Sequence, residues 1–424
     1  MLGRHQKKVY KNGLTLLTVP IETAQSIIMS VFVKAGSRYE TPRVNGISHF
    51  LEHLHFKGTK KYPTAKKLSE VVDSVGGEFN ANTGKEHTQY YIRAASEHLP
   101  LIMDVLTDLI QNPLFDAKEI EREKGVIIEE INMYKDNPQI HIESLFEETM
   151  WPATALGRDI AGTAEVIRSI KRKDILDYRK QWYQPSNTII AVAGKFNEVE
   201  LEKLIDKTWS HLTGPKVGAC SPTVLKQDQP RLAVQNKQTE QAHMMVGFKA
   251  FDYNHKQNPQ LQVMSTVLGG GMSSRLFLQI RERRGLAYYV GSSLNNYLDT
   301  GNFYVRAGLK VSSAPEALEV ILAELMKLTE TGVSTKELKK AKEYIKGKVV
   351  LGMEDPHGTL DWYLTQTAFT KKIETAKEVF AKLEKVTSDE IQTLASQLFK
   401  KNNLVASVIG PFADKTIFER RLKL

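Results

Sequence analysis

The sequence has a single cysteine, Cys220, and lacks any apolar run long enough to cross a membrane. One cysteine cannot form a disulfide within the chain, which favours a reducing compartment. A membrane-spanning helix needs about 20 consecutive apolar residues, so we expect no membrane-embedded segment. The first residues are charged and lack the apolar core of a secretory signal peptide. These absences together predict a cytoplasmic protein.

Acidic side chains are outnumbered by basic ones, with 49 Asp and Glu against 58 Lys and Arg, and the formal net charge is +9. A basic excess of this kind can indicate nucleic-acid binding. The lysines are spread along the chain, however, and often stand beside glutamates, as in residues 336–343. Such runs are typical of a solvated helix face, and no nucleic-acid-binding motif accompanies them. We therefore keep a basic nucleic-acid-binding protein only as an alternative.

Some segments of the chain have apolar residues at every second position, as in strands, and others have them at the helical spacing of three to four residues. This mixture predicts an α+β fold. The first expected element is a hairpin with Asn12-Gly13 at its turn. In the first half, strands are expected at 8–10, 14–19, 26–33, 78–83, 88–94 and 188–193. Helices are expected there at 47–56, 68–75, 96–110, 117–133, 164–169, 173–182 and 199–212.

The second half repeats the first in outline, which indicates a tandem duplication. Residues 118–120 resemble 336–338, and the strand ending at Gly194 resembles 404–410 at nearly the same spacing. This spacing places Lys348 where the first half has Glu130.

A segment with three prolines, residues 213–230, reads as a linker between the two halves. We therefore expect one α+β unit over 1–212 and a homologous unit over 231–424. Each is expected to hold a mixed or antiparallel sheet with helices on one face.

The segment His-Phe-Leu-Glu-His at 49–53 lies on an expected helix. His49 and His53 are four residues apart and share one helix face, and Glu52 lies beside them. A catalytic zinc ion takes three protein ligands and leaves one position open. A nearby carboxylate can then take a proton from metal-bound water. The motif alone also fits two surface histidines on an amphipathic helix.

A third ligand would have to come from elsewhere, and the expected helix 117–133 is rich in glutamate. Two of its glutamates, Glu123 and Glu130, are two helical turns apart and point the same way, whereas neighbouring glutamates are about 100° apart around the axis. The residues alone leave four candidates open: Glu121, Glu123, Glu129 and Glu130. The second half has no His-x-x-Glu-His, so only the first half can hold this site.

These segments resemble the inverzincins of the pitrilysin and insulin-degrading-enzyme family. The short members, which look like mitochondrial processing peptidase subunits, are the most similar. The resemblance extends over nearly the whole chain. It is carried by residues 49–53, 56–59, Asn80-Ala81, Tyr90-Tyr91, 121–123 and 126–130.

The resemblance implies a zinc-dependent endopeptidase with one zinc ion per chain. It makes His49, His53 and Glu130 the ligands, and it makes Glu52 the general base. Glu123 then becomes a carboxylate that orients a ligand histidine through its ring N–H.

The resemblance also implies contacts with a peptide substrate. It assigns Arg281 and Tyr288 to the substrate backbone, and it makes the strand around Asn80 and Ala81 an edge to which an extended peptide adds. From the residues alone, Arg281 would be a solvated helix residue and Tyr288 a strand core residue.

Members of this family enclose their substrates, so the two duplicated units are expected to form one half of a clamshell chamber. The resemblance then implies a dimer in which Arg281 and Tyr288 of one protomer face the zinc of the other. A homodimer is favoured because one chain carries both parts, and a heterodimer with a related subunit is the alternative. The family also contains non-catalytic core or chaperone-like subunits, which give a second interpretation of the function.

Overall fold

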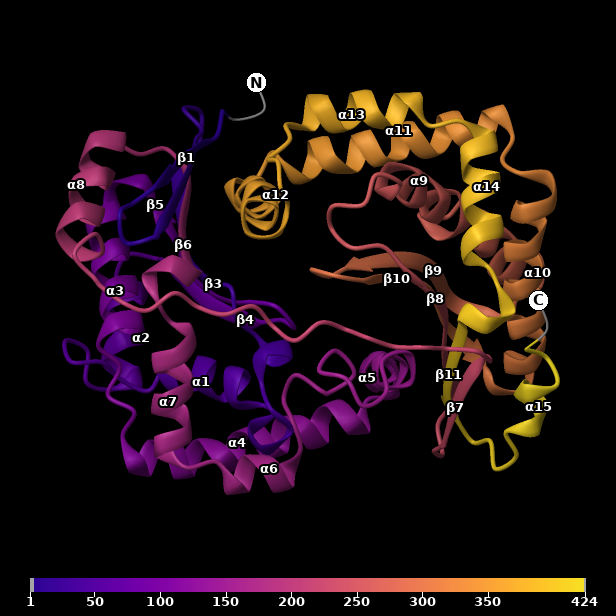
Figure 1. Cartoon of the computed structure of the whole chain (residues 1–424), viewed down its shortest axis with the longest axis horizontal. Coiled ribbons are helices and arrows are strands. Elements are labelled where there is room, and N and C mark those ends of the chain that lie inside the picture. Colours follow the sequence, from indigo (N-terminus) through magenta and orange to yellow (C-terminus); the bar gives the residue numbers. More distant parts are fainter. Residues whose placement is uncertain (1–3, 423–424) are drawn as a thin grey trace. The chain divides into compact units, whose positions relative to one another are not determined.

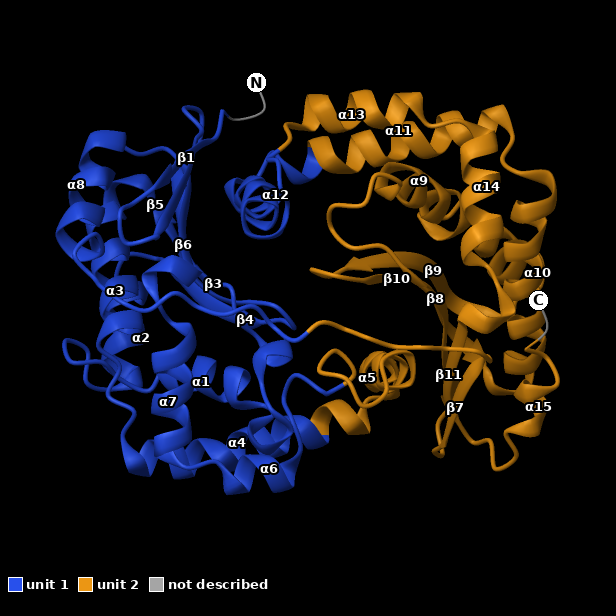
Figure 2. Ribbon diagram, viewed as in Figure 1, with its two compact units in different colours: residues 1–132, 158–221, 351–373 blue, residues 133–157, 222–350, 374–424 orange. Residues whose placement is uncertain are grey.

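The computed structural model describes residues 4–422 (Figure 1). The chain forms two compact units, which are coloured separately in Figure 2. Unit 1 contains the residues up to 132 together with 158–221 and 351–373. Unit 2 contains 133–157, 222–350 and the residues from 374 onward.

Unit 1 is built on a six-stranded sheet with the order β1-β2-β6-β3-β5-β4. Its strands are β1 (Gln6–Val9), β2 (Thr15–Pro20), β3 (Ser26–Val33), β4 (Glu78–Thr83), β5 (Thr88–Ala95) and β6 (Thr188–Gly194). Strands β2 and β6 are parallel and the other neighbours antiparallel. The expected hairpin is present as β1 and β2, and Gly13 in its turn has a φ of 87°.

The helices of unit 1 include the one that carries the His-Phe-Leu-Glu-His segment. They are α1 (Ile47–His55), α2 (Ala65–Asp73), α3 (Leu99–Gln111), α4 (Ala117–Asp136), α6 (Ala164–Ser169), α7 (Arg172–Trp182), α8 (Glu198–Thr208) and α12 (Pro356–Phe369). Helix α4 continues past residue 132 into unit 2.

Unit 2 is built on a five-stranded sheet with the order β7-β11-β8-β10-β9. Its strands are β7 (Arg231–Asn236), β8 (Gln241–Ala250), β9 (Ala287–Asn296), β10 (Gly301–Lys310) and β11 (Leu404–Gly410). Its helices are α5 (Pro138–Met150), α9 (Asn258–Gly269), α10 (Ala314–Thr331), α11 (Thr335–Gly352), α13 (Ala376–Lys385), α14 (Ser388–Leu398) and α15 (Thr416–Glu419), with a π-helical turn at Phe277–Glu282.

The two sheets have the same topology. The order β2-β6-β3-β5-β4 of unit 1 corresponds to β7-β11-β8-β10-β9 of unit 2, and in each sheet the first two of these strands are the parallel pair. Strand β1 is an addition to the first copy. The fold is therefore α+β with two like units, each holding a mixed sheet.

Each unit takes one helix from the other half of the sequence. Helix α5 packs against β7, β8 and β11 of unit 2, and α12 packs against the corresponding strands β2, β3 and β6 of unit 1. The compact units are thus not the consecutive segments 1–212 and 231–424. Segment 213–230 separates the two sheets in sequence, but helices α5 and α12 are exchanged.

The exchanged helices also cover a second face of each sheet, whereas the sequence suggested helices on one face. Along β5, Ile92 belongs to the apolar cluster beneath α3. The neighbouring Tyr91 contacts His357 of α12, with ring centroids 4.7 Å apart. In unit 2, Phe146 of α5 packs with Met245 and Val405 on the face opposite α10. Alternate strand residues point to opposite faces, so both faces are buried.

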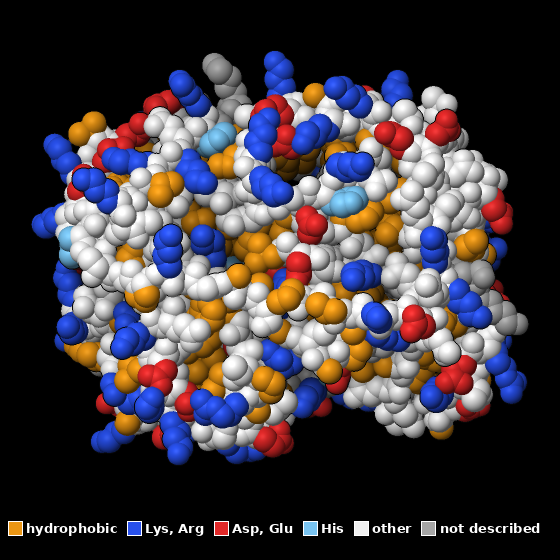
Figure 3. Space-filling model, in the orientation of Figure 1, with side chains coloured by type: hydrophobic (Ala, Val, Ile, Leu, Met, Phe, Trp, Pro, Cys, Tyr) orange, Lys and Arg blue, Asp and Glu red, His pale blue; other side chains and the backbone are white. Residues whose placement is uncertain are grey.

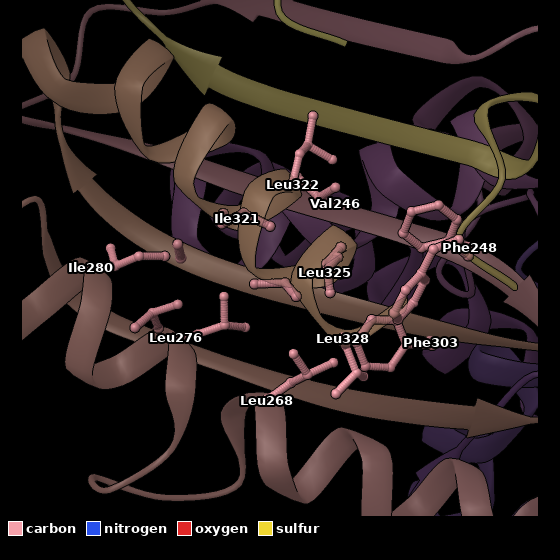
Figure 4. Close-up of a cluster of buried hydrophobic side chains, with 14 of the residues drawn as sticks. Val246, Phe248, Leu268, Leu276, Ile280, Phe303, Ile321, Leu322, Leu325 and Leu328 are labelled. Carbon is pink, nitrogen blue, oxygen red and sulfur yellow. The ribbon is translucent and has the colours of Figure 1, made fainter. Parts of the chain in front are cut away.

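The largest apolar cluster lies between the sheet of unit 2 and α10 (Figure 4). Phe248 and Phe303 come from neighbouring strands, and Leu325 and Leu328 come from α10. All four side chains are fully buried. Burying one such side chain contributes about 1.5–3 kcal/mol, so this cluster holds the helix on the sheet.

Within residues 4–422, no helix combines the length and the apolar character that a bilayer crossing requires. On the face shown in Figure 3, Lys and Arg side chains are spread out with Asp and Glu among them. This distribution agrees with solvated helix faces rather than a concentrated basic surface.

Candidate metal centre

A buried carboxylate fixes the start of the helix that carries the histidine pair. Helix α1 has Gly46 at its N-cap, which offers no capping side chain. Glu40 replaces it by accepting hydrogen bonds from the backbone N–H groups of Gly46 at 2.7 Å and Ser48 at 2.8 Å. The Asn45 amide donates a third hydrogen bond at 2.8 Å. Free N–H groups at a helix start favour a negative charge, so Glu40 anchors α1.

The apolar face of α1 determines where its polar residues point. Phe50, Leu51 and Leu54 are buried against unit 1. His49 and His53 therefore share the opposite side of the helix, with ring centroids 4.5 Å apart.

Helix α4 brings one glutamate to this pair. Oε2 of Glu130 lies 3.7 Å from Nε2 of His49 and 3.4 Å from Nε2 of His53. One donor atom from each of the three residues lies within 4.8 Å of the others. Of the other candidates, Glu121 and Glu129 are exposed. The structure thus brings Glu130 to the histidines, as the resemblance implied.

This donor set fits a zinc ion. The distances to Glu130 exceed a normal hydrogen bond, but ligands of a tetrahedral zinc ion at about 2.0–2.1 Å are separated by about 3.3 Å. Nδ1 of His49 is buried without a hydrogen-bond partner among the described residues. A catalytic zinc site can have two imidazoles and one carboxylate as its protein ligands, and its fourth coordination position stays open.

Glu123 contacts the far side of the His53 ring. Its Oε1 lies 2.8 Å from Nδ1 of His53, and Nζ of Lys57 lies 2.8 Å from its Oε2. Glu123 is 1% exposed. Burial alone would raise its pKa, but the hydrogen bonds from His53 and Lys57 outweigh burial and lower it. When Nδ1 of His53 carries the proton that Glu123 accepts, the lone pair of Nε2 is the one that faces Glu130.

The pKa values of the two histidines are shifted in opposite directions. Burial and the neighbouring His53 lower the pKa of His49 to about 4. For His53, burial acts to lower the pKa, but the hydrogen bond to Glu123 and the nearby carboxylate of Glu130 raise it to about 9. The centre therefore attracts a positive charge, which either a proton or a metal ion can supply.

Glu52 has one hydrogen-bond partner among the described residues. The hydroxyl of Thr83, the last residue of β4, donates to Oε2 of Glu52. Burial raises the pKa of Glu52, and this hydrogen bond opposes the rise. A buried carboxylate with a raised pKa beside a metal centre suits general-base chemistry. No sequence motif marks Thr83 or Glu40, and Lys57 stands in the matching segment 56–59 without an assigned role.

Asn80 and Ala81 lie on the edge strand β4. Their partners across the ladder are Tyr91 and Tyr90 of β5, and β4 has no strand on its other side in the described structure. The backbone N–H of Ala81 donates a hydrogen bond to Oδ1 of Asn80 at 2.8 Å. Strand β4 also packs beside α1. An open strand edge thus lies next to the metal centre.

Arg281 and Tyr288 both lie on unit 2 and are both exposed. Arg281 lies near the end of the π-helical turn Phe277–Glu282, with its guanidinium 5.0 Å from the ring centre of Phe277. Tyr288 is 62% exposed, because a bulge in β9 leaves it between Ala287 and Tyr289, which pair with Leu309 and Gly308. Bulges redirect side chains. Tyr288 is therefore not the strand core residue that the residues alone suggested.

Replacing Glu123 with Gln should weaken zinc binding by about 10- to 100-fold. The amide would keep one contact with His53 but lose the charge that raises the pKa of that imidazole. Zinc affinity is measured by competition with a chromophoric chelator at constant pH. Glu121→Gln, on an exposed residue of the same helix, is the control. Equal affinities for the two variants would contradict a role of Glu123 in holding His53.

Comparison with known proteins gives consistent matches over most of the chain. Residues 16–164 match the family model described as Insulinase (Peptidase family M16), and residues 169–345 match the Peptidase M16 inactive domain. The first match contains the metal centre. The second covers much of the copy without the histidine motif.

Curated relatives align over nearly their full lengths. An uncharacterized zinc protease of Bacillus subtilis is 34% identical over 400 residues, which cover 94% of this chain and 96% of that protein. An uncharacterized zinc protease of Streptomyces coelicolor is 32% identical over 420 residues, covering 98% and 91%.

Solved structures agree with the fold. A protease from Helicobacter pylori superposes with a TM-score of 0.91 at 25% identity, covering 97% of this chain and 100% of that chain. A peptidase M16 inactive domain from Pseudomonas fluorescens superposes with a TM-score of 0.88 at 16% identity and resembles this chain in fold.

Proposed function

Because this chain belongs to peptidase family M16, we propose that it is a zinc-dependent endopeptidase acting on peptides or unfolded polypeptide segments. The observation that carries the proposal is the group of His49, His53 and Glu130, whose donor atoms lie within 4.8 Å of one another. Glu52 lies on the same helix as the two histidines.

Each residue of the centre has a chemical task in this proposal. A zinc ion held by His49, His53 and Glu130 would act as a Lewis acid on the scissile carbonyl and make water at the site more acidic. Glu52 accepts a proton from the attacking water and later donates it to the leaving amine. Its raised pKa makes it a stronger proton acceptor than an ordinary glutamate.

The open edge of β4 supports an extended peptide as the substrate. A peptide that adds to this edge gains main-chain hydrogen bonds, and the position of Asn80 and Ala81 places it beside α1. Such binding depends little on side-chain identity, which suits an enzyme that accepts unfolded segments.

Arg281 and Tyr288 are proposed to contact the substrate backbone, where a cation or phenol donor near the scissile carbonyl would stabilise the developing negative charge. Their exposure leaves both side chains available for this contact. Following the resemblance, we place them opposite the zinc of a second protomer in a chamber formed by a homodimer. The alternative is a heterodimer with a related subunit, and the mass of the complex in solution distinguishes the two assemblies.

Removal of zinc should abolish hydrolysis reversibly. The purified protein is expected to contain about one zinc ion per chain and to cleave members of an unstructured peptide library. Dialysis against a chelator should remove both the metal and the cleavage, and one equivalent of zinc should restore them. Zinc content is measured by atomic emission and cleavage by mass spectrometry.

The control for this experiment is a double variant, His49→Ala and His53→Ala, which should neither retain zinc nor recover activity. A wild-type protein that holds one zinc ion but cleaves no peptide would instead support the non-catalytic core subunit. Cleavage that persists without metal would contradict the proposal.

A further inference from the structure

We propose that Thr83 is a positioning residue that holds the Glu52 carboxylate in a single orientation. The inference rests on the proposed function, because it concerns the residue to which that function gives the proton transfer. It is carried by the hydrogen bond from the Thr83 hydroxyl to Oε2 of Glu52.

The hydrogen bond makes the two carboxylate oxygens of Glu52 different from each other. Oε2 of Glu52 accepts from Thr83, whereas Oε1 has no hydrogen-bond partner among the described residues. Rotation about the last side-chain bond of a glutamate is broad and nearly two-fold, so nothing within Glu52 itself selects an orientation. A hydrogen bond to a charged oxygen is short and strong. Thr83 therefore keeps Oε2 occupied and leaves Oε1 free to meet water.

The register of β4 directs the Thr83 side chain toward α1. Residues Phe79, Ala81 and Thr83 alternate with exposed residues and share the half-buried face of the strand. The ring of Phe79 lies 5.4 Å from that of Phe56, which ends α1. Thr83 meets Glu52 one turn earlier on the same helix. Two contacts from one strand face thus align β4 along α1.

The chain that follows Thr83 is held rigidly, which a positioning residue requires. Glu86 forms a buried ion pair with Arg38 at 2.5 Å. The carbonyls of Gly84 and Lys85 accept hydrogen bonds from the backbone N–H groups of Ser37 and Arg38, at 3.1 Å and 2.8 Å.

The backbone of this turn is also closely packed. A Cβ on Gly36 would lie 2.2 Å from the carbonyl oxygen of Gly84, so the two backbone segments can approach only because residue 36 is glycine. Thr88, which pairs with Thr83 across the ladder, donates to the carbonyl of Ala35 at 2.9 Å. The backbone that carries the Thr83 hydroxyl is thus held in place on both sides of the turn.

The same strand carries the edge on which we expect the peptide to lie. Thr83 is two residues beyond Ala81 along β4. A peptide paired with this edge is thereby placed in a fixed register relative to Glu52, because the strand contacts both of them. Misplacing a catalytic group by about 1 Å can cost about 100-fold in rate.

Thr83→Val tests the role of the hydroxyl at nearly constant volume. We expect kcat to fall by about 10- to 100-fold while KM changes by less than about 3-fold. Zinc content should stay equal to that of the wild type. Thr83→Ser, which restores a hydroxyl, should recover kcat to within about 3-fold of wild type. Thr15→Val, on a half-buried strand residue of the same sheet, is the control and should leave kcat unchanged.

Crystal structures of the zinc-free variants give a measurement that does not depend on activity. Glu52 should keep one carboxylate orientation in the wild type and in Thr83→Ser, and it should turn or take several orientations in Thr83→Val. Thr83→Ala is examined in the same way in case the valine disturbs the fold.

An unmoved Glu52 in both Thr83→Val and Thr83→Ala, or a Thr83→Ser protein as impaired as Thr83→Val, would overturn the inference. The crystallographic comparison still decides the role of Thr83 if the wild-type protein cleaves no peptide. In that case only the proposed function fails.

Discussion

Glu52→Gln should retain its zinc ion and lose about 10²- to 10⁴-fold in kcat, the usual contribution of general acid–base catalysis. The amide has nearly the same volume as the carboxylate and can still meet the Thr83 hydroxyl, but it cannot accept a proton. Because Glu52 is not among the three residues whose donor atoms converge, metal content should not change. The rates of library peptides and the zinc content are measured on the same preparation.

The control for this variant is Glu70→Gln, which changes an exposed carboxylate on α2. It should behave as the wild type in both measurements. A Glu52→Gln protein with full zinc and full activity would show that another group takes the proton, and the assignment of Glu52 would then be wrong.

Glu130→Gln should lower zinc affinity by more than about 100-fold, beyond the 10- to 100-fold effect of losing a residue that only supports a ligand. Its neighbour Glu129 provides a matched control. Both residues are on α4, but Glu130 faces the histidines and Glu129 is exposed. Glu129→Gln should therefore bind zinc as the wild type does. Affinities are compared by chelator competition and by the rate of zinc loss during dialysis.

The reverse result, with Glu129→Gln losing zinc and Glu130→Gln retaining it, would mean that α4 is rotated by about 100° relative to the structure. Unfolding curves for the two metal-free variants separate this outcome from a general loss of the fold.

Most strands and the long amphipathic helices could be predicted from the sequence, because their burial follows a local period. Strand β3 was expected at 26–33 and is Ser26–Val33. The helix expected at 47–56 is α1, Ile47–His55. The division into two units was harder to predict from the sequence. Helix α12 buries one face that includes the polar Thr359 beside Leu360 and Tyr363, so the apolar residues alone do not mark that face.

Local patterns also could not assign α5 and α12 to their sheets. A sequence period shows that a helix has an apolar side, but any sheet with an apolar face can accept it. The exchange of the two helices depends on the path of the chain between them, which leaves no periodic signal.

The metal centre was predictable to different degrees. His49 and His53 were paired by the spacing of a single helix, whereas Glu130 required α4 to pack beside α1, which only the resemblance implied. Thr83 could not be found from any motif, since its role depends on the distance between a strand end and a helix. Without the resemblance, Tyr288 would have been taken for a strand core residue, because no sequence signal marks the bulge beside it.

The exchanged helices have a consequence for proteolysis. A cut within residues 213–230 would leave two polypeptides, but each would still supply one helix to the sheet of the other, α5 in one direction and α12 in the other. The nicked protein should therefore migrate as one particle until it is denatured. A fragment made alone would leave one face of its own sheet uncovered, so the two halves of the chain are expected to depend on each other for solubility.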